Sequence, residues 1–351
     1  MNTIQIKITE SHIENQAIAR AGEIIKAGGL VAFPTETVYG LGGDALSSRA
    51  SGKIYAAKGR PSDNPLIVHI ADMNELEKIA SQIPEAARKL AGRFWPGPLT
   101  MIFQKTDIVP QETTGGLNTV AVRMPSHQVA LALIRAAGGF IAAPSANLSG
   151  RPSPTMAKHV AEDLNGRIDM IIDGGAVDIG LESTIVDMTG VVPMILRPGF
   201  ISREMLAEVL GEVEYDKAIL GVSDLKTPPK APGMKYKHYA PKGALTIVKG
   251  AQENVVEYIR RGIGQKQEQG EIVGVIASEE TYPLYSAAVV EDIGAREDEE
   301  AIARHLYAVL RDFDERGVTC IFSEEFDTPQ MGQAIMNRLM KAAGHHIIEV
   351  S

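Results

Sequence analysis

Hydrophobic positions in the first 200 residues alternate between helical spacing and short apolar runs. In residues 14–27, apolar side chains from Ile18 to Ile25 recur on one helix face, and Gly28 ends the pattern. The same spacing predicts helices over residues 50–58, 73–81, 84–93 and 128–137. Short apolar runs predict strands at residues 30–33, 66–70, 99–104, 119–123, 140–143, 170–173, 183–187 and 194–197. The first part of the chain is therefore predicted to be an α/β domain whose strands often end in Pro, Gly or Ser.

The last 110 residues alternate more regularly. Apolar runs predict strands at residues 245–248, 272–277, 318–322 and 347–350. Helical spacing between them predicts helices at residues 254–261, 298–315 and 329–343. Strands separated by helices are typical of a small parallel sheet, so a second α/β unit is expected here.

Between the two parts lies a segment of unusual composition, Lys226–Lys242. It holds four prolines, five lysines and no acidic residue. Proline interrupts helices and central strands, so the segment is interpreted as a linker. Tyr236, His238 and Tyr239 lie among the lysines. Two interpretations stay open: a segment that folds over an anionic ligand, or a solvated tether.

Composition and charge narrow the possible functions. The chain has 351 residues, enough for two domains, and a formal net charge of −9. Residues 1–200 carry 18 basic and 19 acidic side chains, whereas residues 201–351 carry 17 and 25. This balance argues against non-specific coating of nucleic acid. The single cysteine, Cys320, excludes an intramolecular disulfide and a cysteine-based zinc cluster. Without a long apolar run, the protein is expected to be cytoplasmic and soluble, with no membrane partner.

Several common catalytic motifs are absent from the sequence. Gly52-Lys53 is followed by Ile54, so no phosphate-binding P-loop occurs, and no G-x-S-x-G motif is present. The eight histidines show no metal-ligand spacing. Residues 40–45 match the dinucleotide pattern G-x-G-x-x-A, but Pro34 and a polar stretch precede them where a buried strand is required. A dinucleotide site is therefore disfavoured.

Polar clusters at the ends of predicted strands carry the candidate chemistry. The segment 34–42 places Thr37 and its neighbours beside flexible glycines. Lys58 and Arg60 stand two residues apart in a loop stiffened by Gly and Pro, with Asn64 and His69 on either side of the next strand. A lysine as a point charge and an arginine as a fork suit an oligophosphate, although a surface pair remains an alternative.

Three further clusters repeat this combination of hydroxyls and cations. Arg123 ends a strand and suits a carboxylate, a phosphate or a structural ion pair. The densest cluster, 142–155, contains four hydroxyl residues, an amide and an arginine, and helix capping explains only part of it. Segments 182–187 and 196–199 add hydroxyls and another cation. These clusters predict a concave site without a protein nucleophile, as in phosphoryl and nucleotidyl transfer.

These clusters, taken in order, closely resemble the YrdC-like family of L-threonylcarbamoyladenylate synthases. The resembling stretches are Pro34–Gly42, Lys58–His69, Phe94–Thr100, Val122–Pro125, Ala143–Thr155, Ser183–Asp187 and Leu196–Gly199. Ala231–Pro241 resembles the linker of the longer, two-domain form. The resemblance implies a catalytic domain over 13–200, with a twisted, mostly parallel sheet and an open cavity. It also implies a linker or lid over 201–243 and a smaller Rossmann-like α/β domain over 244–351.

The resemblance also implies a reaction. L-threonine, bicarbonate (or CO2) and ATP give L-threonylcarbamoyladenylate and pyrophosphate. A downstream tRNA threonylcarbamoyl transferase then modifies the adenosine beside the anticodon of tRNAs that read codons beginning with A. No carboxylate cage is evident in the sequence, so Mg2+ is expected to arrive with ATP.

Roles for individual residues follow from the resemblance alone. Threonine is expected to be surrounded by Thr37, His69, Arg123, Ala143 and Ser183. ATP is expected to be held by Lys58, Arg60, Asn64, Thr119, Ser145, Ser153 and Arg197, with Tyr236 or Tyr239 closing over the nucleotide. Lys58 and Arg60 are expected to act on the phosphates as the catalytic cations, and no metal-binding side chain is expected.

Two other readings compete with this one. The first domain could be an RNA-binding or ribosome-maturation module without catalysis, although direct tRNA contact is also compatible with an enzyme. A carbamoyl or adenylyl transfer such as hydrogenase maturation could use the same scaffold. The net charge of −1 over residues 1–200 disfavours the former, and the lack of the expected additional domains disfavours the latter.

Overall fold

The computed structural model describes residues 2–217, 219, 230–232, 238–286 and 288–351. The chain divides into two compact units. The first comprises Met1–Ser149, Ser153–Asp178 and Glu182–Lys235; the second comprises Gly150–Pro152, Ile179–Leu181 and Tyr236–Ser351. The two units are described separately below.

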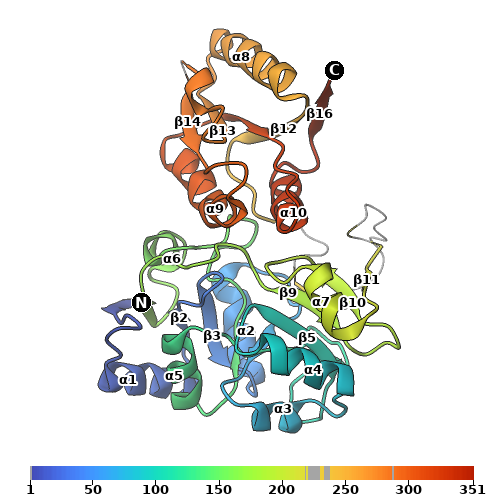
Figure 1. Cartoon of the computed structure of the whole chain (residues 1–351). Helices are drawn as coiled ribbons and strands as arrows, with labels where there is room; N and C mark the ends of the chain where they lie inside the picture. Colours follow the sequence, from blue (N-terminus) through green and yellow to red (C-terminus); the bar gives the residue numbers. More distant parts are fainter. Residues whose placement is uncertain (1, 218, 220–229, 233–237, 287) are drawn as a thin grey trace. The chain divides into compact units, whose positions relative to one another are not determined.

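The first unit is a mixed sheet flanked by helices (Figure 1). Its described strands are β1 (Ile4–Lys7), β2 (Val31–Phe33), β3 (Gly40–Asp44), β4 (Ile67–His69), β5 (Leu99–Gln104), β6 (Thr119–Arg123), β7 (Ile141–Ala142), β8 (Met170–Asp173), β9 (Thr184–Asp187), β10 (Met194–Arg197) and β11 (Glu214–Tyr215). They lie in the order β1-β8-β2-β3-β7-β4-β6-β5-β9-β10-β11. Parallel pairs include β4 with β6 and β5 with β9, and β5 with β6 is antiparallel.

The helices of this unit are α1 (Asn15–Lys26), α2 (Ser48–Lys58), α3 (Met73–Ile79), α4 (Glu85–Phe94), α5 (Gln128–Ala136), α6 (Ala157–Leu164) and α7 (Arg203–Leu210). Side-chain caps begin α2, α3 and α7 of this unit. The Ser47 hydroxyl accepts a hydrogen bond from the Ala50 N–H and begins α2. Gly59 ends α2 in the left-handed conformation at φ 61°, so Lys58 is its last residue and Arg60 lies in the following loop.

The glycine-rich segment 40–45 does not form a dinucleotide-binding turn. Gly40–Asp44 is strand β3, paired antiparallel with β2 and β7. A Cβ on Gly42 would lie 2.9 Å from both Ile141 and Phe33, so this glycine allows close packing within the sheet. The α/β class and most of the predicted elements of this unit are confirmed. Residues 201–243 also contain α7 and β11, and β11 pairs with β10.

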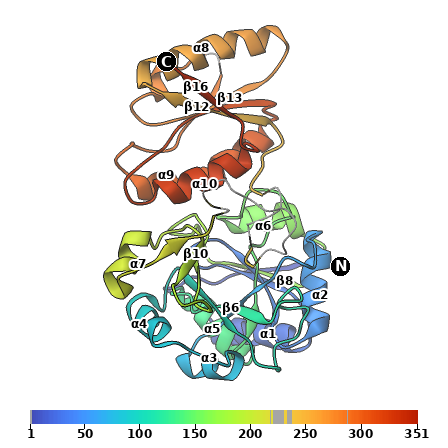
Figure 2. The ribbon, with the colours of Figure 1, turned by 90° about the vertical axis from the view of Figure 1, so that its right-hand side faces the viewer.

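The second unit is a parallel sheet with helices on both faces. Its strands are β12 (Ala244–Gly250), β13 (Val273–Ala277), β14 (Val289–Asp292), β15 (Cys320–Glu324) and β16 (Ile347–Val350), in the order β14-β13-β15-β12-β16. Helix α8 (Gln252–Glu268) covers one face, and α9 (Glu299–Glu315) and α10 (Gly332–Ala342) cover the other (Figure 2). The predicted second α/β unit is thus confirmed. No helix of the described residues is long and apolar enough to cross a membrane.

Candidate active site

One sheet face in the first unit carries four of the predicted site residues, His69, Thr119, Arg123 and Ser183. Strand side chains alternate between faces, so Thr119, Ala121 and Arg123 share one face of β6. The register places His69 of β4 and Thr100 of β5 opposite Arg123. Ile67, Ile102, Ser183 and Ile185 lie on the same side of the sheet. We call this side the β4–β9 face. Its centre is apolar and its polar side chains lie toward the strand ends.

Arg123 is the centre of the polar cluster at one end of the β4–β9 face. Only 4% of its surface is exposed. Its Nη1 donates a hydrogen bond of 2.9 Å to the Thr37 hydroxyl, and its Nη2 lies 2.7 Å from Glu36 Oε1. Its Nε donates to the Gly97 carbonyl at 3.4 Å. The guanidinium is therefore fixed by three residues from two segments of the chain, an arrangement suited to holding a carboxylate in one orientation.

Glu36 is the anionic partner of Arg123 and is 5% exposed. Its contact with Arg123 is an ion pair without hydrogen-bond alignment, and neither carboxylate oxygen accepts a hydrogen bond from the described residues. The preceding Thr35 hydroxyl donates to the Val38 carbonyl at 2.7 Å and fixes the turn that carries both residues. Glu36 is thus a positioning residue for Arg123.

Replacing Glu36 with Ala should lower the free energy of unfolding by about 3–5 kcal/mol, because Arg123 would remain as an uncompensated buried charge. Chemical denaturation of the full chain measures this. The matched control is Glu23→Ala, whose carboxylate is 72% exposed and pairs with Lys26 at 3.0 Å; it should cost at most about 1 kcal/mol. Equal losses in the two variants would contradict a structural role for the buried pair.

His69 ends β4 beside Arg123. Burial, together with the positive charge of Arg123, lowers its pKa from 6.5 to about 3. Its Nδ1 lies 3.2 Å from the Ile67 carbonyl. The imidazole is therefore neutral near pH 7 and can form hydrogen bonds without adding a second positive charge beside Arg123.

This lowered pKa predicts a pH dependence of stability. Between pH 6.5 and about 3 the unfolded chain binds a proton at His69 that the folded chain does not, so stability is lost as pH falls through this window. His69→Gln should flatten the loss measured by denaturation at successive pH values. His12→Gln, at an exposed position, is the control and should keep the wild-type slope. An unchanged slope in His69→Gln would contradict the prediction.

Ser183 and Arg197 meet at the neighbouring strand end. The Ser183 hydroxyl lies 2.7 Å from the Thr100 hydroxyl. The Arg197 guanidinium donates to the Ser183 carbonyl at 2.9 and 3.1 Å and to its hydroxyl at 3.2 Å. Both residues are buried, so the guanidinium at the end of β10 fixes the position of the serine at the start of β9.

Lys58 ties the end of α2 to the loop that follows β7. Its ammonium donates to the carbonyls of Ser145 and Asn147, and the Ser145 hydroxyl donates to Asn147 Oδ1. The Ser149 N–H donates back to the Lys58 carbonyl at 2.9 Å. The buried lysine therefore organises the loop, and Ala143 at its start donates its N–H to the Ile67 carbonyl at 2.9 Å.

The remaining predicted ATP contacts lie near the starts of β4 and β6 or in the 143–155 loop. Arg60 donates to the carbonyls of Asn64 and Pro65 at 3.2 and 3.0 Å. Asn64 is buried, and its Oδ1 accepts no hydrogen bond from the described residues. Thr119 lies on the β4–β9 face, at the opposite end of β6 from Arg123. The buried Ser153 hydroxyl donates to Glu182.

The described start of the linker segment covers part of the β4–β9 face. Ala231 is fully buried in a cluster with Ile67, Ile102, Ala121, Ile185 and Leu196. The Pro232 carbonyl accepts a hydrogen bond from Arg197 at 3.5 Å. Tyr236 lies outside the described residues. Tyr239 belongs to the second unit, where its ring is 5.2 Å from that of Tyr307.

Some residues of this arrangement were not among the predicted site residues. Glu36 and Asn147 lie inside the sequence clusters, but the sequence pattern gives no sign of which contacts a single acidic or amide residue makes. Thr100 was missed because its contact with Ser183 depends on the pairing of β5 with β9. Among the described residues, no group of three or more His, Cys, Asp or Glu side chains could hold a metal ion.

Comparisons with known proteins identify the family of this chain. A family model named for Sua5, YciO and YrdC, described as telomere recombination, matches residues 23–199. A second model, the C-terminal domain of threonylcarbamoyl-AMP synthase, matches residues 201–344. A threonylcarbamoyl-AMP synthase of Pyrococcus abyssi is 49% identical over 99% of this chain and 100% of its own length. One from Bacillus subtilis is 51% identical over 94% of both chains.

A solved structure extends the match to three dimensions. The crystal structure of P. abyssi Sua5 complexed with L-threonine superposes with a TM-score of 0.94 at 48% identity, covering 99% of this chain and 100% of that one. Both family models and full-length relatives therefore lead to the same assignment. The chain belongs to the threonylcarbamoyl-AMP synthase family, with both the Sua5–YciO–YrdC domain and the C-terminal Sua5 domain.

Proposed function

We propose that this nucleotidyltransferase converts L-threonine, bicarbonate or CO2, and ATP into L-threonylcarbamoyladenylate and pyrophosphate. The observation that carries the proposal is the buried, oriented Arg123 on the β4–β9 face, with a neutral His69 beside it. The full-length relatives named threonylcarbamoyl-AMP synthase support the proposal.

The threonine end of the site is proposed to be the cluster around Arg123. The guanidinium pairs with the substrate carboxylate, since it presents several N–H groups in a fixed plane. His69, neutral at working pH, and the Ser183 hydroxyl offer hydrogen bonds to the substrate hydroxyl and amine. Thr37, which contacts Arg123, and Ala143, which contacts the Ile67 carbonyl, are proposed to form the rest of the threonine pocket.

The ATP end is proposed to extend from Asn64 and Thr119 toward the 143–155 loop. The unsatisfied Asn64 Oδ1 is an acceptor for a donor on the nucleotide. Lys58 and Arg60 supply positive charge for the phosphates, and Ser145 and Ser153 provide further contacts. Arg197, which lies beside Ser183 at the threonine end of the face, would contact the part of the nucleotide nearest to threonine. Because Lys58 already binds two loop carbonyls, its charge also sets the shape of that loop.

The chemistry then needs positioning and exclusion of water. The threonine amine joins CO2, losing a proton, or bicarbonate, with loss of water, and becomes a carbamate. A carbamate oxygen attacks the α-phosphorus of ATP, and the bond to pyrophosphate breaks. Carbamates hydrolyse readily, so the apolar centre of the face and its cover at Ala231 favour a dry site.

Mg2+ is proposed to enter with ATP. The described residues offer no cluster of carboxylates and imidazoles for a resident ion. An ion that keeps its waters and binds the phosphates needs few protein ligands. When bound, it would supply positive charge beside the phosphates, while the protein residues orient the triphosphate.

The product is an unstable mixed anhydride, so a consuming enzyme must accept it quickly. We propose that the acceptor is a tRNA threonylcarbamoyl transferase acting at the adenosine beside the anticodon. Direct tRNA binding by this chain is not required by the proposal.

The proposal is tested by measuring pyrophosphate release with each substrate omitted in turn. Release should require threonine and bicarbonate together, and mass spectrometry should detect threonylcarbamoyl-AMP. Pyrophosphate release without threonine, or the absence of release with all substrates and Mg2+ present, would refute it.

The cover at Ala231 gives a further prediction. Ala231→Glu places a charge among buried aliphatic side chains and should displace the segment, raising the KM for ATP about tenfold. Ala231→Gly keeps the small size and should stay close to wild type. Steady-state pyrophosphate release at varied ATP measures both. A wild-type KM in Ala231→Glu would show that this contact does not help to hold the nucleotide.

A further inference from the structure

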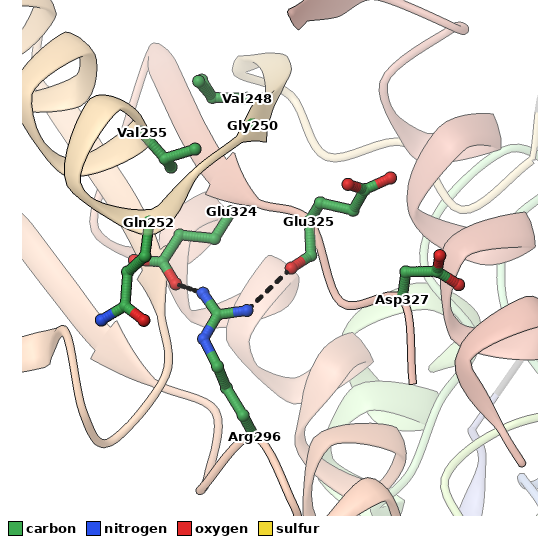
Figure 3. A pocket seen from close by; sticks show the side chains of 8 residues that line it. All are labelled: Val248, Gly250, Gln252, Val255, Arg296, Glu324, Glu325 and Asp327. Carbon is green, nitrogen blue, oxygen red and sulfur yellow. Dashed lines mark hydrogen bonds and ion pairs between the residues drawn. The ribbon is translucent and has the colours of Figure 1, made fainter. Parts of the chain in front are cut away.

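The second unit contains a crevice at the carboxyl ends of its strands. Helix α8 follows β12 to one face of the sheet, and α10 follows β15 to the other (Figure 2). Ligands of open α/β sheets usually bind at such a switch point. Here the crevice measures about 200 Å³, and Arg296 lies across it, bonded to the Glu324 carboxylate and the Glu325 carbonyl (Figure 3). Lys249 pairs with Glu325 at 3.0 Å. Most of the charged groups around this crevice are therefore paired with one another.

A second cavity, of about 510 Å³, lies under α8 at the opposite ends of the same strands. Its floor includes Cys320 and Phe322 of β15 and Thr246 of β12, and Tyr258 of α8 lines it from above. Volumes of this size are typical of small-molecule sites. We call it the α8 cavity.

The local fold explains why this space remains unfilled. Strand β16 pairs with β12 only from Ile247 to Gly250, so the first half of β12 has a neighbour on one side only. Helix α8 continues to Glu268 and overhangs this narrower corner of the sheet. At Gly262 it packs closely, because a Cβ there would lie 2.8 Å from the Phe322 ring. The helix thus roofs a gap that the sheet does not fill.

The charges around the α8 cavity differ from those of the switch-point crevice. Arg261 and Lys266 line it, and their contacts among the described residues are with neutral groups. Arg261 lies 5.8 Å from the Tyr258 ring centroid, and Lys266 Nζ donates to Gln269 at 3.4 Å. The nearby Glu271 accepts a hydrogen bond from the Thr319 hydroxyl. Two cations without an ionic partner therefore border an aromatic and apolar space.

We propose that the α8 cavity is a binding site for a small amphipathic anion, with an aromatic or branched apolar body and one carboxylate or phosphate. Tyr258 and Phe322 would contact the body, and Arg261 and Lys266 would pair with the anionic group. The Thr246 hydroxyl and His346 Nδ1, 3.0 Å apart, supply a polar pair on the wall. This site is separate from the β4–β9 face and does not depend on the proposed reaction.

The only cysteine of the chain serves as a reporter, because Cys320 lines this cavity. Burial raises the pKa of its thiol, so alkylation by neutral iodoacetamide will be slow and sensitive to occupancy. Intact-mass measurements of the full chain give the rate of Cys320 alkylation. Phenylacetate at about four times its Kd should slow labelling about fivefold, whereas phenylacetamide, which has the same shape without the charge, should have little effect.

Variants identify the charges responsible. The double variant Arg261→Gln/Lys266→Gln should lose protection by phenylacetate. Arg260→Gln, at an exposed neighbouring position that does not line the cavity, should keep it. Phenyl phosphate tests a phosphate in place of the carboxylate. Protection of Cys320 by either phenylacetate or phenyl phosphate would support the proposal. Saturation-transfer NMR of phenylacetate and phenyl phosphate with wild type and the double variant gives a readout independent of Cys320.

Two outcomes would overturn the proposal. Equal protection by phenylacetamide and the anions would show that charge is not recognised. Neither protection nor saturation transfer with phenylacetate and phenyl phosphate would show that the cavity is a packing void.

Discussion

Arg123→Ala is expected to lower kcat/KM for threonine about 10³-fold, the largest effect of any single substitution on the β4–β9 face. Loss of the charged, oriented partner of a carboxylate in a buried site costs about 4 kcal/mol, which corresponds to this factor. Arg123→Lys should recover only part of the loss, because an ammonium cannot reproduce the planar fork held by Thr37 and Gly97. Pyrophosphate release at varied threonine measures both variants.

The control for this prediction separates substrate binding from folding. Arg123→Ala also leaves Glu36 as an unpaired buried carboxylate, so its unfolding transition must be measured alongside its activity. The control variant is Arg88→Ala, at a surface arginine whose side chain is 49% exposed. It should change neither the unfolding transition nor the activity. If a folded Arg123→Ala protein kept the wild-type KM for threonine, the proposed carboxylate site would be wrong.

Lys58→Ala is expected to reduce turnover at least about 100-fold, because a cation near the developing phosphate charge is lost. The structure adds a second consequence. The carbonyls of Ser145 and Asn147 lose their donor, so stability should fall by about 1–3 kcal/mol. Kinetics at varied ATP and chemical denaturation measure the two effects.

A lysine on the same helix provides the matched control. Lys53 also donates to a backbone carbonyl, that of Gly28, but lies away from the 143–155 loop. Lys53→Ala should therefore lose some stability and keep its turnover. Near-normal product formation by Lys58→Ala would contradict the role proposed for this cation.

The sequence predicts those elements of the fold that have a clear period. The helix over residues 128–137 and the strand at 119–123 correspond to α5 and β6 within one residue. Strand β3 escaped prediction because Gly40–Asp44 has no alternating pattern; its glycines reflect close packing against Phe33 and Ile141. Helix α7 was missed because it lies in a stretch interpreted as linker.

The candidate site was also predicted only where the sequence carries a clear pattern. Cations at strand ends, such as Arg123 and Arg197, stand out in the sequence because they follow apolar runs. The contact of Thr100 with Ser183 does not stand out, because these residues are 83 positions apart in sequence and meet only when β5 pairs with β9. The contacts of the buried Lys58 ammonium with two carbonyls were also missed, because the sequence does not show that the loop after β7 lies against the end of α2.

The most direct test of the account is a crystal structure of the full chain with L-threonine and a non-hydrolysable ATP analogue. The threonine carboxylate should lie on the Arg123 guanidinium beside His69, with the α-phosphate close to the threonine amine on the β4–β9 face. Threonine bound away from Arg123, or the nucleotide bound outside this face, would contradict the central claim.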